Sequence, residues 1–150
     1  MALHPTSSPL FHALACGTLV QMSKVLTYLA REKKINFRRF VETGGMPSSH
    51  AASVAALSTC VGLRSGFDSL LFDVTVYFSL IIIYDAAGLR RAAGRQATLL
   101  NRILHEHIKL PGPPHERLRE FLGHTPIEVL VGALIGVLFS IALYRSPGGP

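Results

Sequence analysis

Charged residues are absent from long stretches of this sequence, and this feature restricts the possible folds more than any other. The stretches that contain no Lys, Arg, Asp or Glu are residues 1–23, 43–63, 74–84 and 129–144. A helix needs about 20 largely apolar residues to cross the roughly 30 Å hydrocarbon layer of a membrane. Only 16% of the chain is charged, against about a quarter in a typical soluble domain. A membrane protein is therefore favoured over a soluble helical bundle with a basic face.

We expect one all-α domain over residues 1–150, built as an integral membrane bundle of about four transmembrane or membrane-embedded helices. The predicted helices are residues 9–31, 46–63, 68–104 and 125–144, with a Pro-rich loop at 105–121. The second helix is short and rich in Ala and Ser, which indicates a bundle-interior position. The first segment lacks the positive leading region of a signal peptide, so we expect it to be retained as a helix.

The basic residues are distributed unevenly along this predicted topology. If four helices cross in alternation, all 15 lysines and arginines except Arg64 and Arg145 fall on one side. The positive-inside rule makes that side cytoplasmic and puts both termini outside, in a cell (inner or plasma) membrane. The net charge of +6 is then explained by the membrane, and no nucleic-acid partner is expected.

The second predicted helix starts on the basic side, within residues 44–50. Two glycines are followed by Pro47, Ser48, Ser49 and His50. Proline suits the first turn of a helix. The unpaired N–H groups and the positive dipole end of a helix N-terminus make an anion site.

The last predicted helix starts on the same side, at residues 122–128. Thr125 is a natural N-cap, Pro126 suits the next position, and Glu128 completes a capping box. His124 precedes the cap directly. Two helix N-termini, each beside a histidine, therefore face the basic side.

Arginines and one acid gather near these helix starts. Arg90 and Arg91 follow the third apolar run, and Asp85 lies at the end of that run. Guanidinium groups, backbone N–H donors and two imidazoles suit a phosphate ligand. An intramembrane acid is a functional candidate, with a nearby arginine as its partner. Taken alone, each imidazole is better explained as an ordinary interfacial histidine, and Glu128 is equally consistent with a helix cap only.

Other polar residues give weaker signals. His105, His107 and His115 lie in the Pro-rich segment without a second ligand pattern, so we expect them to be solvated and predict no metal and no cofactor. Asp85 and Glu128 together are only a weak indication of a divalent cation. Cys16 and Cys60 form no disulfide framework.

Three blocks of the sequence together resemble the divergent branch of the type 2 phosphatidic acid phosphatase superfamily, which also contains the vanadium haloperoxidases. The resemblance extends over about residues 21–143, and the middle block is the most distinctive. The blocks are residues 44–50 (GGMPSSH), 84–94 (YDAAGLRRAAG) and 122–129 (LGHTPIEV).

The main superfamily has three motifs, Lys-x6-Arg-Pro, Pro-Ser-Gly-His and Ser-Arg-x5-His-x3-Asp. The resemblance implies that His124 is the nucleophile, that His50 is the general acid and that the Glu128 carboxylate orients His124. It implies polar support from Asp85 and Thr125. The residues that it implies as phosphate-binding are Lys24, Arg31, Ser48, Ser49, Arg90 and Arg91. The sequence departs from the motifs at three places. Glu32 replaces the first-motif proline, Ser49 replaces the second-motif glycine, and Leu118 stands where the third-motif arginine is usual.

The resemblance implies a metal-independent phosphatase that hydrolyses a lipid phosphate through a phosphohistidine, with its active site on the cytoplasmic face. Because the third arginine is missing, the alternative is non-catalytic binding or transport of an anionic lipid or polyprenyl phosphate. A vanadate-dependent oxidase is a weaker third possibility. Four helices make a small bundle, so a homodimer among membrane lipids is also expected.

Overall fold

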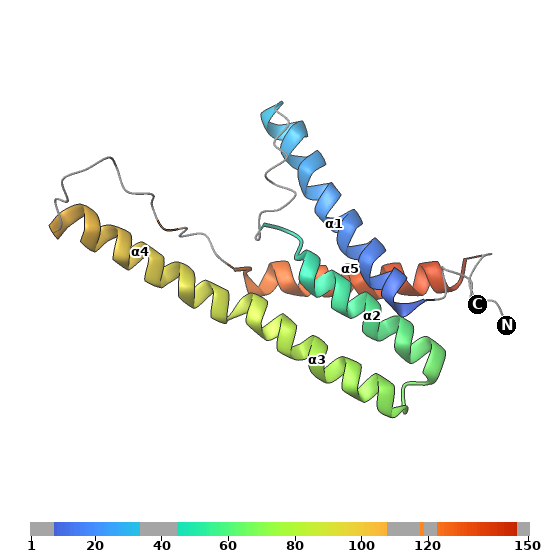
Figure 1. Cartoon of the computed structure of the whole chain (residues 1–150). Coiled ribbons are helices and arrows are strands. Elements are labelled where there is room, and N and C mark those ends of the chain that lie inside the picture. Colours follow the sequence, from blue (N-terminus) through green and yellow to red (C-terminus); the bar gives the residue numbers. More distant parts are fainter. Residues whose placement is uncertain (1–7, 34–44, 108–117, 119–122, 147–150) are drawn as a thin grey trace.

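The computed structural model describes residues 8–33, 45–107, 118 and 123–146, and within them the chain forms α-helices and no strand (Figure 1). The helices are α1 (Pro9–Glu32), α2 (Ser49–Ser65), α3 (Leu70–Ala87), α4 (Leu89–His107) and α5 (Pro126–Tyr144). The predicted all-α class is therefore confirmed.

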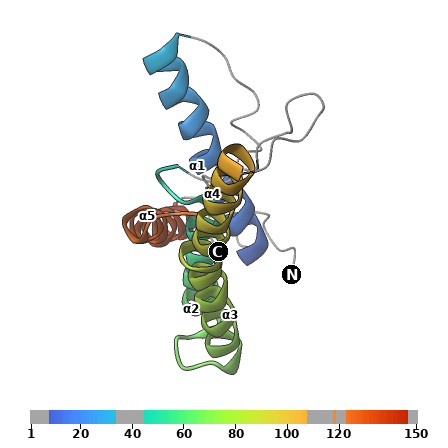
Figure 2. The same ribbon diagram turned by 90° about the vertical axis from the view of Figure 1, so that its left-hand side faces the viewer.

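The single helix predicted at 68–104 is divided into α3 and α4 at Gly88. The break is slight, because the Gly88 N–H donates to the Tyr84 carbonyl at 2.8 Å and the Gly88 carbonyl accepts from Ala92 N–H at 3.0 Å. Figures 1 and 2 show that α4 continues the direction of α3. Residues 105–107, predicted as loop, are the last residues of α4. The α2 helix begins at Ser49 rather than at 46, because Ser48 is its N-cap.

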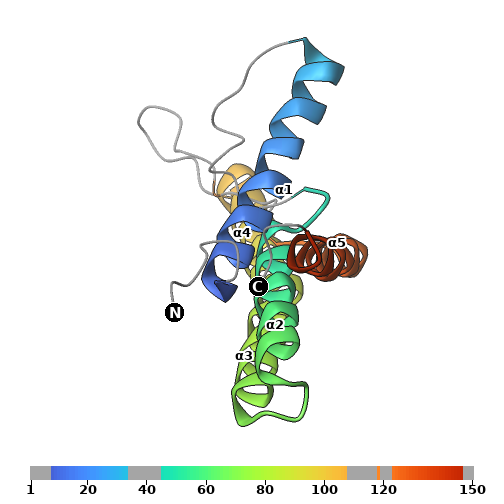
Figure 3. The ribbon, with the colours of Figure 1, turned by 90° about the vertical axis from the view of Figure 1, so that its right-hand side faces the viewer.

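The short helix α2 occupies the interior of the bundle, as its composition predicts. It packs against α1, α3 and α5 (Figure 3). Its buried residues are small or of moderate size: Ala51, Ala52, Ala56, Ser58, Cys60, Val61 and Gly62. Small side chains let helix backbones approach closely, which is the usual basis of helix packing inside membranes.

Two glycines of α5 let this helix lie directly against the backbone of α2. A Cβ atom added at Gly132 would overlap the Ser48 carbonyl oxygen and lie 3.1 Å from the Ser48 nitrogen. A Cβ atom added at Gly136 would overlap the Ala52 carbonyl oxygen and lie 2.9 Å from the Ala55 Cβ. The start of α2 is therefore pressed directly against the first half of α5.

Large apolar side chains lie on the outside of α3 and α5, which is the reverse of a soluble protein. The 18 residues of α3 contain only two buried ones, Ser79 and Ala86. Among the described residues, 70–104 and Pro126–Tyr144 have the length and hydropathy to cross a membrane. The crossing of α1 and α2 stays a prediction. The exposed side chains are Leu70, Leu71, Val74, Tyr77, Phe78, Leu80, Ile81, Ile82 and Tyr84 on α3 and Ile127, Leu130, Leu134, Val137 and Leu138 on α5.

A buried polar pair joins the first turn of α1 to the last turns of α5. His12 Nδ1 and Ser140 Oγ are 2.7 Å apart, and both residues are fully buried.

We expect Ser140→Ala to lower the free energy of unfolding by about 0.5–2 kcal/mol, because it removes the partner of a buried imidazole nitrogen. Thermal unfolding in detergent measures this change. Ser146→Ala is the matched control, since the Ser146 hydroxyl only donates to the nearby Leu143 carbonyl, and an equal effect of both substitutions would contradict the expectation.

Candidate functional site

The candidate site lies where α2 and α5 begin and α3 ends. Two backbone hydrogen bonds join these three helix ends. The Ser48 N–H donates to the Glu128 carbonyl at 3.0 Å, and the His124 N–H donates to the Ala86 carbonyl at 3.0 Å. Gly123, with φ at +92°, turns the chain into this position in a conformation that favours glycine. The segments that carry the two histidines are thus fixed against each other through their backbones.

The two histidines expected to act together are neighbours in the structure. The ring centroids of His50 and His124 are 6.2 Å apart, and the ring planes meet at 61°. His124 is 2% exposed, whereas His50, in the first turn of α2, is only partly buried. Two imidazoles at this separation can both reach one phosphoryl group, since reacting atoms need to approach within about 3–3.5 Å.

The Glu128 carboxylate holds the His124 ring and caps α5 at the same time. Its Oε2 atom accepts from the His124 ring at Nδ1, 3.2 Å away, and from the Thr125 N–H at 2.9 Å. The Thr125 hydroxyl accepts in turn from the Glu128 N–H at 3.3 Å, which completes the predicted capping box. A carboxylate only accepts, so this contact puts the His124 proton on Nδ1 and directs the lone pair of Nε2 away from Glu128.

The two serines before His50 differ in what they can offer a ligand. Ser48 is fully buried, its hydroxyl accepts from the Ala51 N–H at 3.3 Å, and its backbone N–H is bonded to the Glu128 carbonyl. The Ser48 hydroxyl therefore caps α2, and the Ser48 N–H joins the start of α2 to the start of α5. Ser49 is the first residue of α2, where helical N–H groups have no partner within the helix.

Lys24 and Asp85 are also placed at this end of the bundle. The charge of Glu128 acts on the partly buried Lys24 ammonium, which brings α1 into the electrostatics of the site. Asp85 is partly buried in the last turn of α3, next to the Ala86 whose carbonyl accepts from His124.

The arginines expected at the site are located only by their backbones. Arg90 and Arg91 are in the first turn of α4, and Arg31 is at the end of α1, about 10 Å along the helix from Lys24. The side chains of these three arginines lie outside the described part of the structure.

The position of the missing third-motif arginine is far from the two histidines. Leu118 is held on α4 by Asn101, whose amide donates to the Leu118 carbonyl at 2.9 Å and whose carbonyl accepts from the Leu118 N–H at 3.0 Å. Asn101 is 15 residues beyond Ala86, which corresponds to about 22 Å of helix. A charge at position 118 would not reach the histidines in this arrangement.

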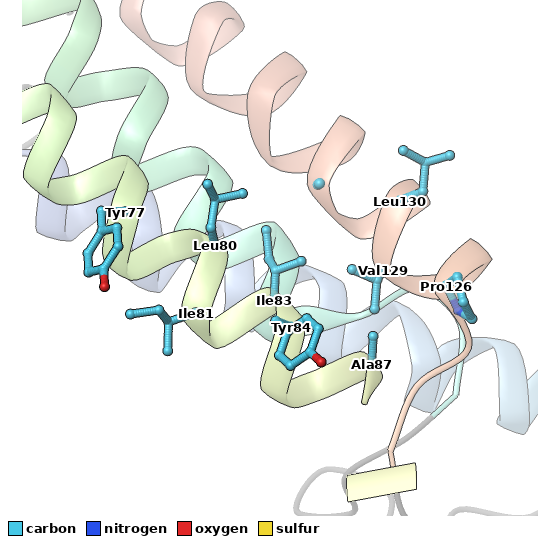
Figure 4. A pocket seen from close by; sticks show the side chains of 10 residues that line it. Tyr77, Leu80, Ile81, Ile83, Tyr84, Ala87, Pro126, Val129 and Leu130 are labelled. Atoms are coloured by element: carbon cyan, nitrogen blue, oxygen red, sulfur yellow. The ribbon is translucent and has the colours of Figure 1, made fainter. Parts of the chain in front are cut away.

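An apolar groove runs between α3 and α5 beside the candidate site (Figure 4). It has a volume of about 700 Å³, and apolar side chains dominate its wall. One end of the groove is formed by Ala87, Pro126 and Val129, which are chain neighbours of the site residues. The remaining lining residues are Tyr77, Leu80, Ile81, Ile83, Tyr84, Leu130 and Ala133.

Sequence reasoning missed the groove and the close contact at Gly132. The Gly132-x3-Gly136 spacing in an apolar helix was the available signal for the contact, since small residues four apart mark a helix-packing face. Among the described residues, no group of three or more His, Cys, Asp or Glu side chains is arranged to hold a metal ion.

Comparisons with known proteins agree with this architecture. The family model of the Divergent PAP2 family matches residues 6–139. The chain is also 41% identical over 149 residues to the uncharacterized membrane protein YuiD of Bacillus subtilis (strain 168). This alignment covers 92% of the present chain and 94% of YuiD. No solved structure matches the chain. The match over most of its length shows that the chain belongs to the Divergent PAP2 family.

Proposed function

We propose that this membrane protein is a lipid phosphate phosphatase that works through a phosphohistidine. One observation carries the proposal: two imidazoles from different helices lie 6.2 Å apart, and a carboxylate orients one of them. A single interfacial histidine needs no such partner. The arrangement matches a nucleophile held by a third group and paired with an acid.

In the first step, Nε2 of His124 attacks the phosphorus atom of a phosphomonoester. The nitrogen–phosphorus bond forms while the phosphorus–oxygen bond to the lipid breaks. His50 in its protonated form donates a proton to the leaving alkoxide, which departs as an alcohol. Glu128 stabilises the positive charge that develops on the His124 ring, since it accepts from Nδ1.

In the second step, water attacks the phosphorus atom of the phosphohistidine. His50, now neutral, accepts a proton from that water. The nitrogen–phosphorus bond breaks, its electron pair returns to Nε2 of His124, and inorganic phosphate leaves. Both histidines are then in their starting protonation states.

The phosphoryl oxygens would be held by the positive groups of this end of the bundle. The Ser49 N–H and the N-terminal dipole of α2 contribute partial positive charge. Lys24 adds an ammonium near Glu128. We assign the remaining contacts to Arg90 and Arg91, because they start α4 within two turns of Ala86, and we expect a lesser role for Arg31.

The groove between α3 and α5 gives the lipid chain of the substrate a place beside the site. Its wall is apolar, and it ends at Pro126 and Val129, which directly follow the capping-box residues Thr125 and Glu128 in the chain. A substrate with a phosphate head and a hydrocarbon chain fits both parts at once.

For the orientation in the membrane, we propose a cytoplasmic site with both termini outside. The contact of His12 with Ser140 brings the start of α1 to the end of α5, at the opposite end of α5 from His124. The two helices that enter and leave the bundle thus share one side. Most of the basic residues belong to the other side, which the positive-inside rule makes cytoplasmic.

The test is phosphate release from a panel of lipid phosphomonoesters by the pure full-length protein in mixed micelles. Phosphatidic acid, phosphatidylglycerol phosphate and prenyl phosphates cover the chemistry of the head group and of the chain. We expect release without added metal, and release that is unchanged by a chelator.

No phosphate release from any of these lipids, together with retained binding of the lipids, would favour the second candidate function, which is binding or transport of an anionic lipid. The displacement of position 118 from the histidines is the observation that favours this second candidate.

A further inference from the structure

The helix α4 has an apolar face and a basic face. Over residues 92–104, the large apolar side chains recur at helical spacing on one side and are exposed. Leu99, Leu100, Ile103 and Leu104 are between 36% and 61% exposed. At 100° per residue these four positions share one half of the helix. A soluble helix normally buries such a stripe against a neighbour.

A positively charged stripe borders the apolar face of α4. Arg95 and Arg102 are exposed and lie seven residues apart, so they share one stripe on the side away from Leu100. No Asp or Glu occurs between Ala92 and Leu104. The whole helix contains four arginines and one glutamate. This half-apolar, half-basic pattern is typical of helices that lie in a membrane interface.

The apolar face of α4 is not covered by the rest of the bundle. In the described residues, the substantial helix contacts of α4 are all with α3, and Figure 1 shows α4 extending away from the other helices. Asn101 contacts Leu118, the described residue of the segment before α5 nearest to it, on the polar part of the helix. Leu99 and Leu104 lie about 16–24 Å beyond Gly88 along the axis.

We propose that α4 binds the surface of an anionic bilayer, with its leucine face in the acyl boundary and Arg95 and Arg102 among lipid phosphates. The membrane-capable stretch 70–104 includes α3 and most of α4. The 18 residues of α3 alone extend about 27 Å, so a span formed by α3 ends where α4 begins. Because α4 continues the direction of α3 in this structure, the proposed contact requires the chain to bend at Gly88, the residue that separates the two helices. Guanidinium groups complement the charge of anionic headgroups, whereas a second copy of this chain would present the same positive face. This inference does not depend on catalysis.

The test uses tryptophan fluorescence, because the chain contains no Trp. The full-length variants Leu100→Trp and Thr98→Trp are reconstituted in phosphatidylcholine vesicles with and without phosphatidylglycerol, some of them made with brominated acyl chains. We expect blue-shifted emission and at least about twofold stronger quenching at position 100 than at position 98 in anionic vesicles. Ile103→Trp serves as a second apolar-face probe if Leu100→Trp does not fold.

The arginines are tested in the same vesicles. Adding Arg95→Gln and Arg102→Gln to Leu100→Trp should lower the quenching in anionic vesicles to the level seen without phosphatidylglycerol. Equal quenching at positions 98 and 100, or no quenching at either, would overturn the proposal. Blue-shifted emission that brominated chains do not quench, and that disappears as the protein-to-lipid ratio falls, would also overturn it and would assign the face to a second copy of this chain. Phosphatase activity enters none of these readouts.

Discussion

Replacing His124 by alanine is expected to lower phosphate release by at least about 10³-fold, with the protein still folded. The substitution removes the nitrogen that would bond to phosphorus, and no other described histidine stands in the same relation to Glu128. Turnover measured with saturating lipid phosphate, beside a melting curve in the same detergent, separates lost chemistry from lost folding. His107→Ala is the control, since it changes a histidine in the last turn of α4.

Replacing His50 by alanine is expected to act differently, because its role is to move protons. With a lipid alkyl phosphate the loss should be about 10²–10⁴-fold, the usual range for a general acid. With an aryl phosphate, whose leaving group needs little protonation, the first step should survive. The second step still lacks its base, so the variant should release one aryl alcohol per site in a burst and hold the phosphate on His124.

These two variants together decide the assignment. A burst of aryl alcohol from His50→Ala that is absent from the double variant His50→Ala with His124→Ala supports His124 as the nucleophile and His50 as the group that moves protons. Turnover that His124→Ala leaves unchanged would reject His124 as the nucleophile. If Glu128→Gln instead matched wild type on every substrate, the contact at Nδ1 would be a helix cap without a part in catalysis.

The elements that the sequence predicted well are those set by local chemistry. The start of α5 needs only Thr125, Pro126 and Glu128, three neighbours whose side chains cap their own backbone. The interior position of α2 follows from its small residues, which cannot cover a lipid-facing surface. The slight break at Gly88 was missed because the residues on both sides of it favour helix, and the backbone hydrogen bonds continue almost unbroken across it.

The parts of the site that the sequence left open depend on contacts between distant segments. Nothing local indicates that the Ser48 N–H would bond to the Glu128 carbonyl, 80 residues away, instead of remaining available to a ligand. The hydrogen bonds between Asn101 and Leu118 are also non-local, and they explain why motif spacing alone could not locate position 118. The nearness of His50 to His124 could be predicted only as a consequence of helix direction, without a distance.

Gly132→Ala is expected to damage the fold strongly. The added methyl group meets the Ser48 carbonyl oxygen, and this is a backbone atom that cannot rotate away. Overpacking of this kind costs about 1–3 kcal/mol, and contact with backbone puts it near the upper end. The melting temperature of the protein in detergent should therefore fall by roughly 6–12 °C.

Gly136→Ala and Ala142→Val distinguish a local effect on the site from a general one. Gly136 meets Ala52 one turn further into the bundle, so its substitution should lower the melting temperature similarly. Ala142 is exposed on the same helix, and its enlargement should change the melting temperature little. Only Gly132→Ala pushes directly on the residue whose N–H bonds to Glu128, so it should lose more activity than Gly136→Ala at temperatures where both are folded. Wild-type stability of Gly132→Ala would mean that α2 and α5 do not approach as closely as this structure has them, and the separation of the two imidazoles would then have to be larger.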